Sequence, residues 1–183
     1  MGATKTTKLI RKERVLFVVT EDWYFISHRL ALAIYLKTVG YNVAVATRTN
    51  TGANLISESG IQLFPLAKMK RGSLNPLTAL MTVFELAGIY RRFKPDIVHH
   101  VALMPVILGF FAAGLSGVSR RVNAIAGLGF VFTSTTLKAR LIRLAVMPIL
   151  MISLSGHRSI ALVQNEDNVS TLNRFPITPR HFR

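Results

Sequence analysis

Short apolar runs alternate along the chain with longer segments of helical periodicity, and this alternation restricts the fold more than any other feature of the sequence. The runs are rich in β-branched residues and end at polar ones, as expected for strands buried on both faces of a sheet. We predict strands at 15–20, 41–47, 60–66, 96–101, 120–127 and 159–165. We predict helices between them at 27–39, 104–115 and 137–154, and one that starts at 76 and stops before Pro95.

The ends of two helices have recognisable signals. Ser27 is a candidate N-cap for the first helix, and Gly40 follows its last residue. In the helix before Pro95, Asn75 is the expected cap and Pro76 the expected first residue. Its apolar face comprises Leu77, Leu80, Met81, Phe84 and Gly88.

Strands and helices that alternate at this spacing form parallel strands joined by right-handed crossovers. The sequence therefore predicts an α/β fold with a doubly wound parallel sheet. A chain of 183 residues, half of them hydrophobic, can bury one substantial core and requires no second domain. In such a sheet the carboxyl ends of all strands open on one edge, where ligands bind.

Five unusual segments follow the predicted strands, so we expect them to share that edge. They are 21–28 (EDWYFISH), 68–76 (KMKRGSLNP), the pair His99 and His100, 127–134 (GLGFVFTS) and 164–168 (QNEDN). This clustering predicts a ligand site at the carboxyl edge and does not name the ligand.

The segment after the first strand carries the densest group of aromatic residues in the chain. Trp23 has a flat ring that can stack on a sugar, and Asp22 has a carboxylate that accepts hydrogen bonds from hydroxyls, so this segment favours a carbohydrate ligand. Tyr24 and Phe25 have an alternative role in covering the first helix, which we prefer for Phe25.

Ser27 and His28 resemble a nucleophile and its base. The G-x-S-x-G turn of the α/β-hydrolases is absent, however, and Ser27 is better interpreted as a helix cap. We expect His28 to lie at the N-terminus of the helix, close enough to the edge of the sheet to touch a ligand.

His99 and His100 are adjacent on a predicted strand, so their side chains point to opposite faces and cannot chelate one metal ion. Without a further ligand at suitable spacing, we predict no metal site. One of the two is expected to face the cleft, and the other to be a hydrogen-bonded core or interface residue. Gly127 and Gly129 lack the third glycine of a dinucleotide-binding fingerprint, but they allow a backbone to approach a ligand closely.

The chain is strongly basic, with 23 Lys and Arg against eight Asp and Glu and a formal net charge of +15. An early cluster comprises Lys5, Lys8, Arg11, Lys12 and Arg14. Nucleic acid would suit this charge, but stacking aromatic residues are sparse and no zinc finger or RNA-binding motif is present. With a mean hydropathy of +0.39, an anionic membrane surface is the better fit.

Two apolar stretches, 101–115 and 144–154, are shorter than the roughly 20 residues that span a bilayer. We expect the first to form a core helix and the second to lie at a membrane interface. The absence of cysteine excludes disulfides and thiolate metal sites. The polar, basic start of the chain does not have the pattern of a secretory signal.

Five segments of the chain, in this order, resemble the N-terminal domain of family 4 glycosyltransferases. They are RVLFVVTEDWYFISHRLALA, GYNVAVATR, GIQLFPLAKMKRGSLNPL, FKPDIVHHV and NAIAGLGFVFTS. The likeness is closest to bacterial enzymes that extend lipid-linked sugars for surface polysaccharides, and it spans about residues 13–168. It implies the first half of a GT-B fold, in which two Rossmann-like domains face each other across a cleft, the first binding mainly the acceptor and the second mainly the sugar nucleotide.

Carried over position by position, the resemblance implies a set of acceptor- or substrate-binding residues: Asp22, Trp23, Ser27, His28, His99, Gly127 and Gly129. Some relatives contact the transferred sugar through another histidine two positions after the first, but this chain has Val101 there. A basic group of Lys68, Lys70 and Arg71 is expected to contact the membrane or the acceptor diphosphate. The implied reaction requires no metal and no cofactor, and no catalytic residue is assigned in this half.

The implied reaction moves a sugar from a nucleotide-diphosphate sugar to a hydroxyl of a polyprenyl-diphosphate-linked saccharide, with retention of the anomeric configuration. The family's acidic E-x7-E motif belongs to the donor half, and the same spacing of Glu13 and Glu21 is interpreted as a coincidence. We expect a basic arm over 1–12, the acceptor domain over 13–168, and the start of a linker over 169–183. Without the donor domain, the chain is expected to be inactive.

The expected partners are therefore a sugar nucleotide, a lipid-linked saccharide, an anionic membrane surface and a donor domain in cis or in trans, without nucleic acid. The expected location is cytoplasmic and peripheral, on the inner face of the plasma membrane. An alternative is a non-catalytic subunit that recruits a split glycosyltransferase to the membrane. A third hypothesis, supported by charge alone, is a nucleic-acid-binding domain whose affinity would fall steeply as salt rises.

Overall fold

The strands form one six-stranded sheet in which every neighbouring pair is parallel. The computed structural model describes residues 12–72, 75–125, 136–156 and 158–163. Within them the strand order is β3-β2-β1-β4-β5-β6. The strands are β1 Arg14–Glu21, β2 Asn42–Arg48, β3 Gln62–Pro65, β4 Ile97–Val101, β5 Arg120–Ile125 and β6 Ser159–Val163. Each predicted strand overlaps an observed one, and the predicted α/β fold with a doubly wound parallel sheet is confirmed.

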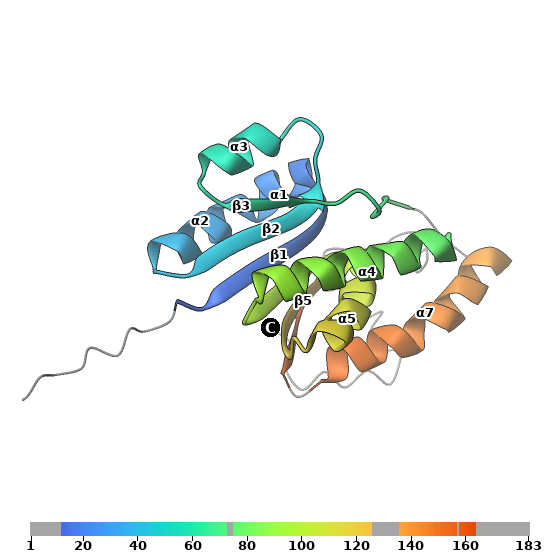
Figure 1. Ribbon diagram of the computed structural model, residues 1–183. Helices are drawn as coiled ribbons and strands as arrows, with labels where there is room; N and C mark the ends of the chain where they lie inside the picture. The colour runs from blue at the N-terminus through green and yellow to red at the C-terminus, as the bar shows by residue number, and fades with distance from the viewer. Residues whose placement is uncertain (1–11, 73–74, 126–135, 157, 164–183) are drawn as a thin grey trace, which may run out of the picture.

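The helices cover the two faces of the sheet in separate groups (Figure 1). One group packs mainly over β1 and β2: α1 Asp22–His28, α2 Leu30–Thr38 and α3 Ala53–Glu58. The other packs on the opposite face: α4 Pro76–Phe93, α5 Leu103–Ser116 and α7 Leu137–Ser155. In the part of the chain described above, none of these helices is long and apolar enough to cross a membrane.

The first helical segment differs from the prediction. The segment after β1 is itself helical, because α1 begins at Asp22, and a break at Arg29 separates it from α2. Ser27 is therefore not an N-cap; its hydroxyl donates a hydrogen bond to the carbonyl of Trp23, 2.8 Å away, one turn earlier in α1. His28 lies in the last turn of α1, so the expectation that it starts a helix is wrong as well.

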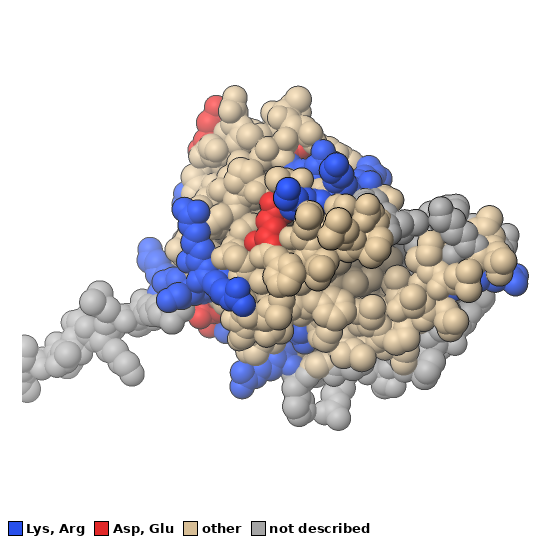
Figure 2. All heavy atoms as spheres, turned by 45° about the vertical axis from the view of Figure 1, so that its right-hand side comes forward, with Lys and Arg blue, Asp and Glu red and all other residues tan. Residues whose placement is uncertain are grey.

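The start of α4 matches the prediction, but its predicted apolar face does not turn inward. Asn75 Oδ1 accepts hydrogen bonds from the backbone N–H groups of Leu77 and Thr78, and Pro76 is the first residue. The apolar side chains Leu77, Leu80, Met81 and Phe84 are all exposed. Figure 2, which brings the right-hand side of Figure 1 forward, shows a broad surface of uncharged residues with Lys and Arg side chains around its margins.

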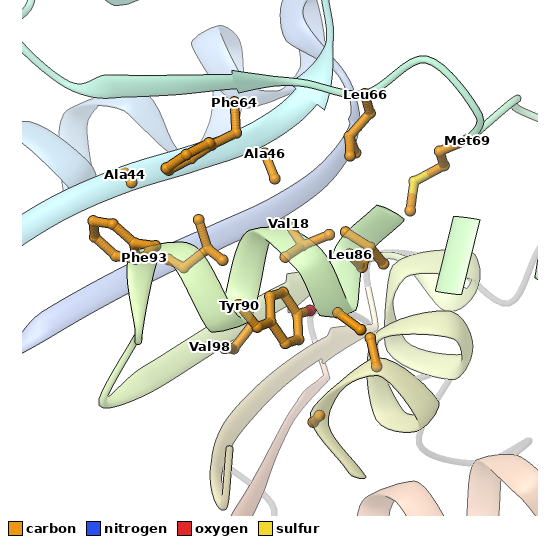
Figure 3. Close-up of a cluster of buried hydrophobic side chains, with 14 of the residues drawn as sticks. Val18, Ala44, Ala46, Phe64, Leu66, Met69, Leu86, Tyr90, Phe93 and Val98 are labelled. Carbon is orange, nitrogen blue, oxygen red and sulfur yellow. The ribbon is translucent and has the colours of Figure 1, made fainter. Parts of the chain in front are cut away.

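The residues that α4 buries lie on the adjacent face of the helix: Thr82, Val83, Leu86, Ala87, Tyr90 and Phe93. Side chains such as Leu86, Tyr90 and Phe93 pack against Val18, Ala44 and Phe64 of the sheet (Figure 3). The small residues Ala112 and Ala113 of α5 join the same cluster. The buried face runs from Thr82 to the end of the helix at Phe93 and includes the large side chains of Tyr90 and Phe93, whereas the predicted stripe ends at Gly88, which has no side chain to bury.

A polar chain crosses the buried layer on this side of the sheet. Tyr90 Oη lies 2.9 Å from His100 Nε2, and His100 Nδ1 lies 2.8 Å from Asn123 Oδ1. Asn123 Nδ2 donates to Ser159 Oγ at 2.9 Å. These four residues are all at most 5% exposed. His100 is thus the hydrogen-bonded core histidine that the sequence predicted for one of the pair.

Candidate functional site

The carboxyl edge of the sheet brings α1 and the segment after β3 together. The guanidinium carbon of Arg71 lies 5.8 Å from the centroid of the Trp23 ring, which is a cation–π distance. Trp23 is 48% exposed, and Arg71, Lys70 and Lys68 are exposed as well. The structure therefore joins two of the predicted segments into one surface, which presents an aromatic ring beside Arg71, with Lys68 and Lys70 exposed in the same segment as Arg71. We call these four residues the rim cluster.

Asp22 holds α1 in place from beneath Trp23. Its carboxylate is fully buried and accepts three backbone hydrogen bonds, from Asn50 at 2.6 Å, from Trp23 at 2.8 Å and from Gly52 at 2.9 Å. Burial alone would raise the pKa of Asp22, but these hydrogen bonds outweigh it and hold that pKa below its usual 3.8. The carboxylate thus ties the segment after β2 to the start of α1 and supports the position of Trp23.

Glu21 extends this support and was not identified from the sequence as a site residue. Its carboxylate lies 3.2 Å from a guanidinium nitrogen of Arg48 and accepts a hydrogen bond of 3.0 Å from Asn50 Nδ2. The signal available in the sequence was its place as the first acid after the first strand. Two adjacent acids, Glu21 and Asp22, therefore fix the same segment.

The basic segment after β3 is fixed by α4 and by one buried side chain. The carboxylate of Glu85 accepts hydrogen bonds from the backbone N–H groups of Ala67 at 2.8 Å and Lys68 at 3.0 Å. Met69 is fully buried. These anchors hold the backbone at Ala67 and Lys68 and turn Met69 inward, so the cations at 68, 70 and 71 face solvent. Glu85 is a second residue that the sequence analysis missed, because its role depends on contacts 17 and 18 residues away.

Ser27 and His28 lie one helical turn beyond Trp23. Ser27 Oγ is 2.7 Å from His28 Nδ1, and the imidazole stacks on Tyr24 with 4.2 Å between ring centroids and 7° between ring planes. Both Ser27 and His28 are exposed. This stacking gives the imidazole a defined place on the outer surface of α1.

His99 lies inside the protein and not on the exposed edge. It is 6% exposed, and its ring centroid is 5.1 Å from that of Phe17. Burial, followed by electrostatic effects of the Arg29 guanidinium and of the neighbouring His100, lowers the pKa of His99 from 6.5 to about 3. Among the described residues, neither His99 Nε2 nor Arg29 Nε has a hydrogen-bond partner. A substrate-binding role for His99 stays a prediction.

Several other predicted features lie outside the described residues. Among the site residues these are Gly127 and Gly129. Among the segments they are 164–168, most of the basic arm over 1–12 and all of the linker over 169–183. In the described ranges, no three or more His, Asp or Glu side chains are grouped as metal ligands would be. The domain boundaries, the absence of a cofactor and the residue assignments stay predictions.

Comparison with known proteins gives a family match over most of the chain. Residues 14–165 match the model of a family described as glycosyl transferase 4-like. No curated protein sequence matches the chain at a significant level.

Solved structures resemble the chain in fold. A glycosyltransferase from Rickettsia africae superposes with a TM-score of 0.68 at 16% identity, over 94% of this chain and 42% of that one. HepE from Anabaena, solved with UDP and glucose, gives a TM-score of 0.64 at 10% identity, over 93% and 43%. A UDP-N-acetylglucosamine 2-epimerase gives 0.64 at 16% identity, over 94% and 47%. Because the chain spans under half of each structure and shares the fold with an epimerase too, these likenesses show the architecture alone.

Proposed function

Since the chain belongs to the glycosyl transferase 4-like family, we propose that it is the acceptor-binding half of a retaining glycosyltransferase of bacterial surface-polysaccharide synthesis. A sugar would pass from a nucleotide-diphosphate sugar to a hydroxyl of a polyprenyl-diphosphate-linked saccharide. The bond from the anomeric carbon to the diphosphate breaks, a bond to the acceptor oxygen forms on the same face, and the proton of the acceptor hydroxyl passes to the departing nucleoside diphosphate. The chain works on the inner face of the plasma membrane and needs a donor domain in cis or in trans.

The observation that carries this proposal is the rim cluster. An exposed indole offers a flat apolar face on which a sugar ring can stack, and the cations of Lys68, Lys70 and Arg71 suit a diphosphate. In a lipid-linked saccharide these two groups are adjacent, because the diphosphate is bonded directly to the first sugar. The contact between Trp23 and Arg71 places matching groups of the protein side by side.

The supports of the rim cluster have a role in this scheme. Asp22 and Glu85 do not need to touch the acceptor, since the carboxylate of each accepts hydrogen bonds from backbone N–H groups. Asp22 fixes the start of α1, and Glu85 fixes the start of the basic segment. They are positioning residues, which hold the ring and the cations ready before the acceptor binds.

The sugar nucleotide is assigned to the partner domain. HepE, which shares the fold, was solved with UDP and glucose and with UDP-glucose. This supports a nucleotide sugar as the donor. The scheme uses no metal or cofactor, and the diphosphate leaving group would be held by the donor domain.

The test is a transfer assay with the 183-residue chain, a lipid-linked acceptor, a panel of labelled sugar nucleotides and a separately produced donor domain of the same family. We expect labelled product only when both proteins are present. Trp23→Ala should lower transfer by roughly 5- to 150-fold, as the loss of one aromatic stacking contact of about 1–3 kcal/mol implies. Tyr35→Ala, which removes another exposed aromatic side chain, on α2, is the matched control and should have no effect.

Two results would count against the proposal. Equal transfer by the Trp23→Ala and Tyr35→Ala variants would remove the rim cluster from the acceptor site. If the donor domain alone transferred the sugar, and the chain merely brought it to membranes, the chain would be the non-catalytic recruiting subunit instead.

A further inference from the structure

Two helices that begin near the carboxyl edge expose large apolar side chains. On α4 these are Leu77, Leu80, Met81 and Phe84, and in the first half of α7 they are Leu137, Leu141 and Leu144. Their side chains are between 45% and 74% exposed. We call these seven residues the apolar surface. Single exposed leucines need no explanation, but two stripes of apolar side chains, one on each of the helices that flank α5, do.

The topology places both stripes on the same side of the molecule. Helices that connect parallel strands run back along the sheet, so each begins beside its carboxyl edge. α4 and α7 flank α5 on one face of the sheet, and their first residues lie at the same end (Figure 1). The stripes occupy the first half of each helix, beside the rim cluster.

The core does not need these residues. α4 fills the core with its adjacent face, including Val83 and Leu86, and α7 does so with Met147, Leu150 and Leu154 of its second half. Within each stripe the spacing of three or four residues keeps the side chains in line along the helix. Each helix therefore carries a second apolar face that is exposed and does not pack in the core described above.

The basic residues around the apolar surface indicate what kind of partner covers it. Lys68, Lys70 and Arg71 lie where the chain enters α4, and Arg140 is exposed between the leucines of α7. Figure 2 shows Lys and Arg side chains around the margins of an uncharged face. Glu85, the acid nearest to the stripe of α4, accepts two backbone hydrogen bonds. A second copy of this chain, with its net charge of +15, would bring like charges together, whereas anionic lipid headgroups complement them.

We propose that the apolar surface docks the chain on an anionic bilayer, with the leucines and Phe84 among the acyl chains and the basic residues of the rim cluster at the headgroup phosphates. This rests on the membrane location in the proposed function and names the surface responsible for it. Docked this way, the carboxyl edge lies at the level of the headgroups. The diphosphate of a lipid-linked acceptor is found at the same level.

The test is vesicle flotation of the 183-residue chain without acceptor or sugar nucleotide, so it is independent of transfer. Vesicles contain phosphatidylcholine alone or a mixture with phosphatidylglycerol. The double variant Leu80→Glu/Phe84→Glu should bind the mixed vesicles roughly 100-fold more weakly than the unmodified chain, from the loss of two buried apolar side chains. The matched control, Leu32→Glu/Tyr35→Glu, changes two exposed residues of α2 on the opposite face of the sheet and should bind normally.

A second measurement covers the case in which the double variant fails to fold. Trp23 is the single tryptophan of the chain, so Trp23→Phe/Phe84→Trp moves the fluorescent residue onto the apolar surface. Its emission should be quenched by brominated acyl chains in mixed vesicles, whereas Trp23→Phe/Tyr35→Trp should not be quenched.

Three results would overturn the proposal. The first is equal vesicle binding by the Leu80→Glu/Phe84→Glu variant and its control. The second is self-association of the unmodified chain that these substitutions abolish, which would assign the surface to a second copy. The third is the absence of vesicle binding together with capture of a donor domain that the same substitutions prevent. Labelled product can still form in the transfer assay under each of these results, so failure of the docking proposal is distinguishable from failure of the proposed function.

Discussion

At the scale of single residues, the two adjacent histidines of β4 show how a strand separates neighbouring side chains. His99 lies beside Phe17 under α1, and His100 lies beside Tyr90 under α4. Both are buried, and neither has an acid as a partner in the contacts described above. Burial is the first cause that lowers both pKa values, from 6.5 to about 3 for His99 and to about 4 for His100.

These pKa values predict a loss of stability in mild acid. Above pH 6.5 the histidines are neutral in both the folded and the unfolded chain, so they add no pH dependence. Between pH 6.5 and about 4 the two histidines bind protons in the unfolded chain but remain neutral in the folded chain. The free energy of unfolding should therefore fall by up to about 1.4 kcal/mol per pH unit for each histidine as the pH is lowered through this window.

Urea titrations at a series of pH values will measure this slope. His100→Gln removes one of the two titrating groups while it keeps a polar side chain beside Asn123, so it should reduce the slope by about half. A slope unchanged in His100→Gln would show that other groups cause the acid sensitivity. Arg29 near His99 and Arg121 near His100 are the cations that reinforce both shifts.

At the scale of elements, α5 contains two glycines in very different surroundings. A Cβ atom at Gly109 would collide with the ring of His100, whereas one at Gly114 would meet no atom within 4 Å. Gly109 therefore allows α5 to approach the strand that carries the buried histidine. Glycine is required at position 109 because there is no space for a side chain, and not because of the backbone conformation there.

We predict opposite effects for alanine at these two positions. Gly109→Ala should lower the free energy of unfolding by about 1–3 kcal/mol, because it overpacks a closed site. Gly114→Ala should leave it unchanged or raise it by up to about 1 kcal/mol, as alanine favours an exposed helical position. Thermal or urea unfolding of both variants is the measurement, and equal stabilities would contradict the packing described for His100.

The elements also show what the sequence could predict. Continuous apolar runs located all six strands, because strands buried on both faces leave a strong local pattern. The local pattern failed at α1, which Asp22 links to Asn50 and Gly52 about thirty residues away, and at α4, where two apolar faces competed for the core. The short α3 was not predicted at all. The edge location of Trp23 and Lys68 followed from topology, but the supports Glu21 and Glu85 depend on contacts that no local pattern contains.

At the scale of the whole molecule, charge and apolar surface act together. The net charge of +15 draws the chain to any anionic partner, and exposed charges are largely screened at about 1 M salt, where the Debye length is about 3 Å. The apolar surface provides an attraction that salt does not screen. The two attractions can thus be separated by salt.

We predict that binding to phosphatidylglycerol-containing vesicles weakens as salt rises but remains measurable at about 1 M, whereas binding to duplex DNA disappears. Flotation and fluorescence anisotropy across a salt series will measure the two. Complete release from vesicles at about 1 M salt, together with tighter binding to duplex DNA than to vesicles at low salt, would favour the nucleic-acid hypothesis. Trp23→Ala should not alter the DNA curve.

The strand order has a consequence for the way the chain assembles during synthesis. β2 pairs with both β1 and β3, so this side of the sheet can form once the chain as far as Pro65 has left the ribosome. β4, β5 and β6 then extend the other side in the order in which they are synthesised. No strand has to be inserted between two that are already paired. We therefore expect each newly made crossover to find its site open, which shortens the time that an unpaired apolar strand waits in solution.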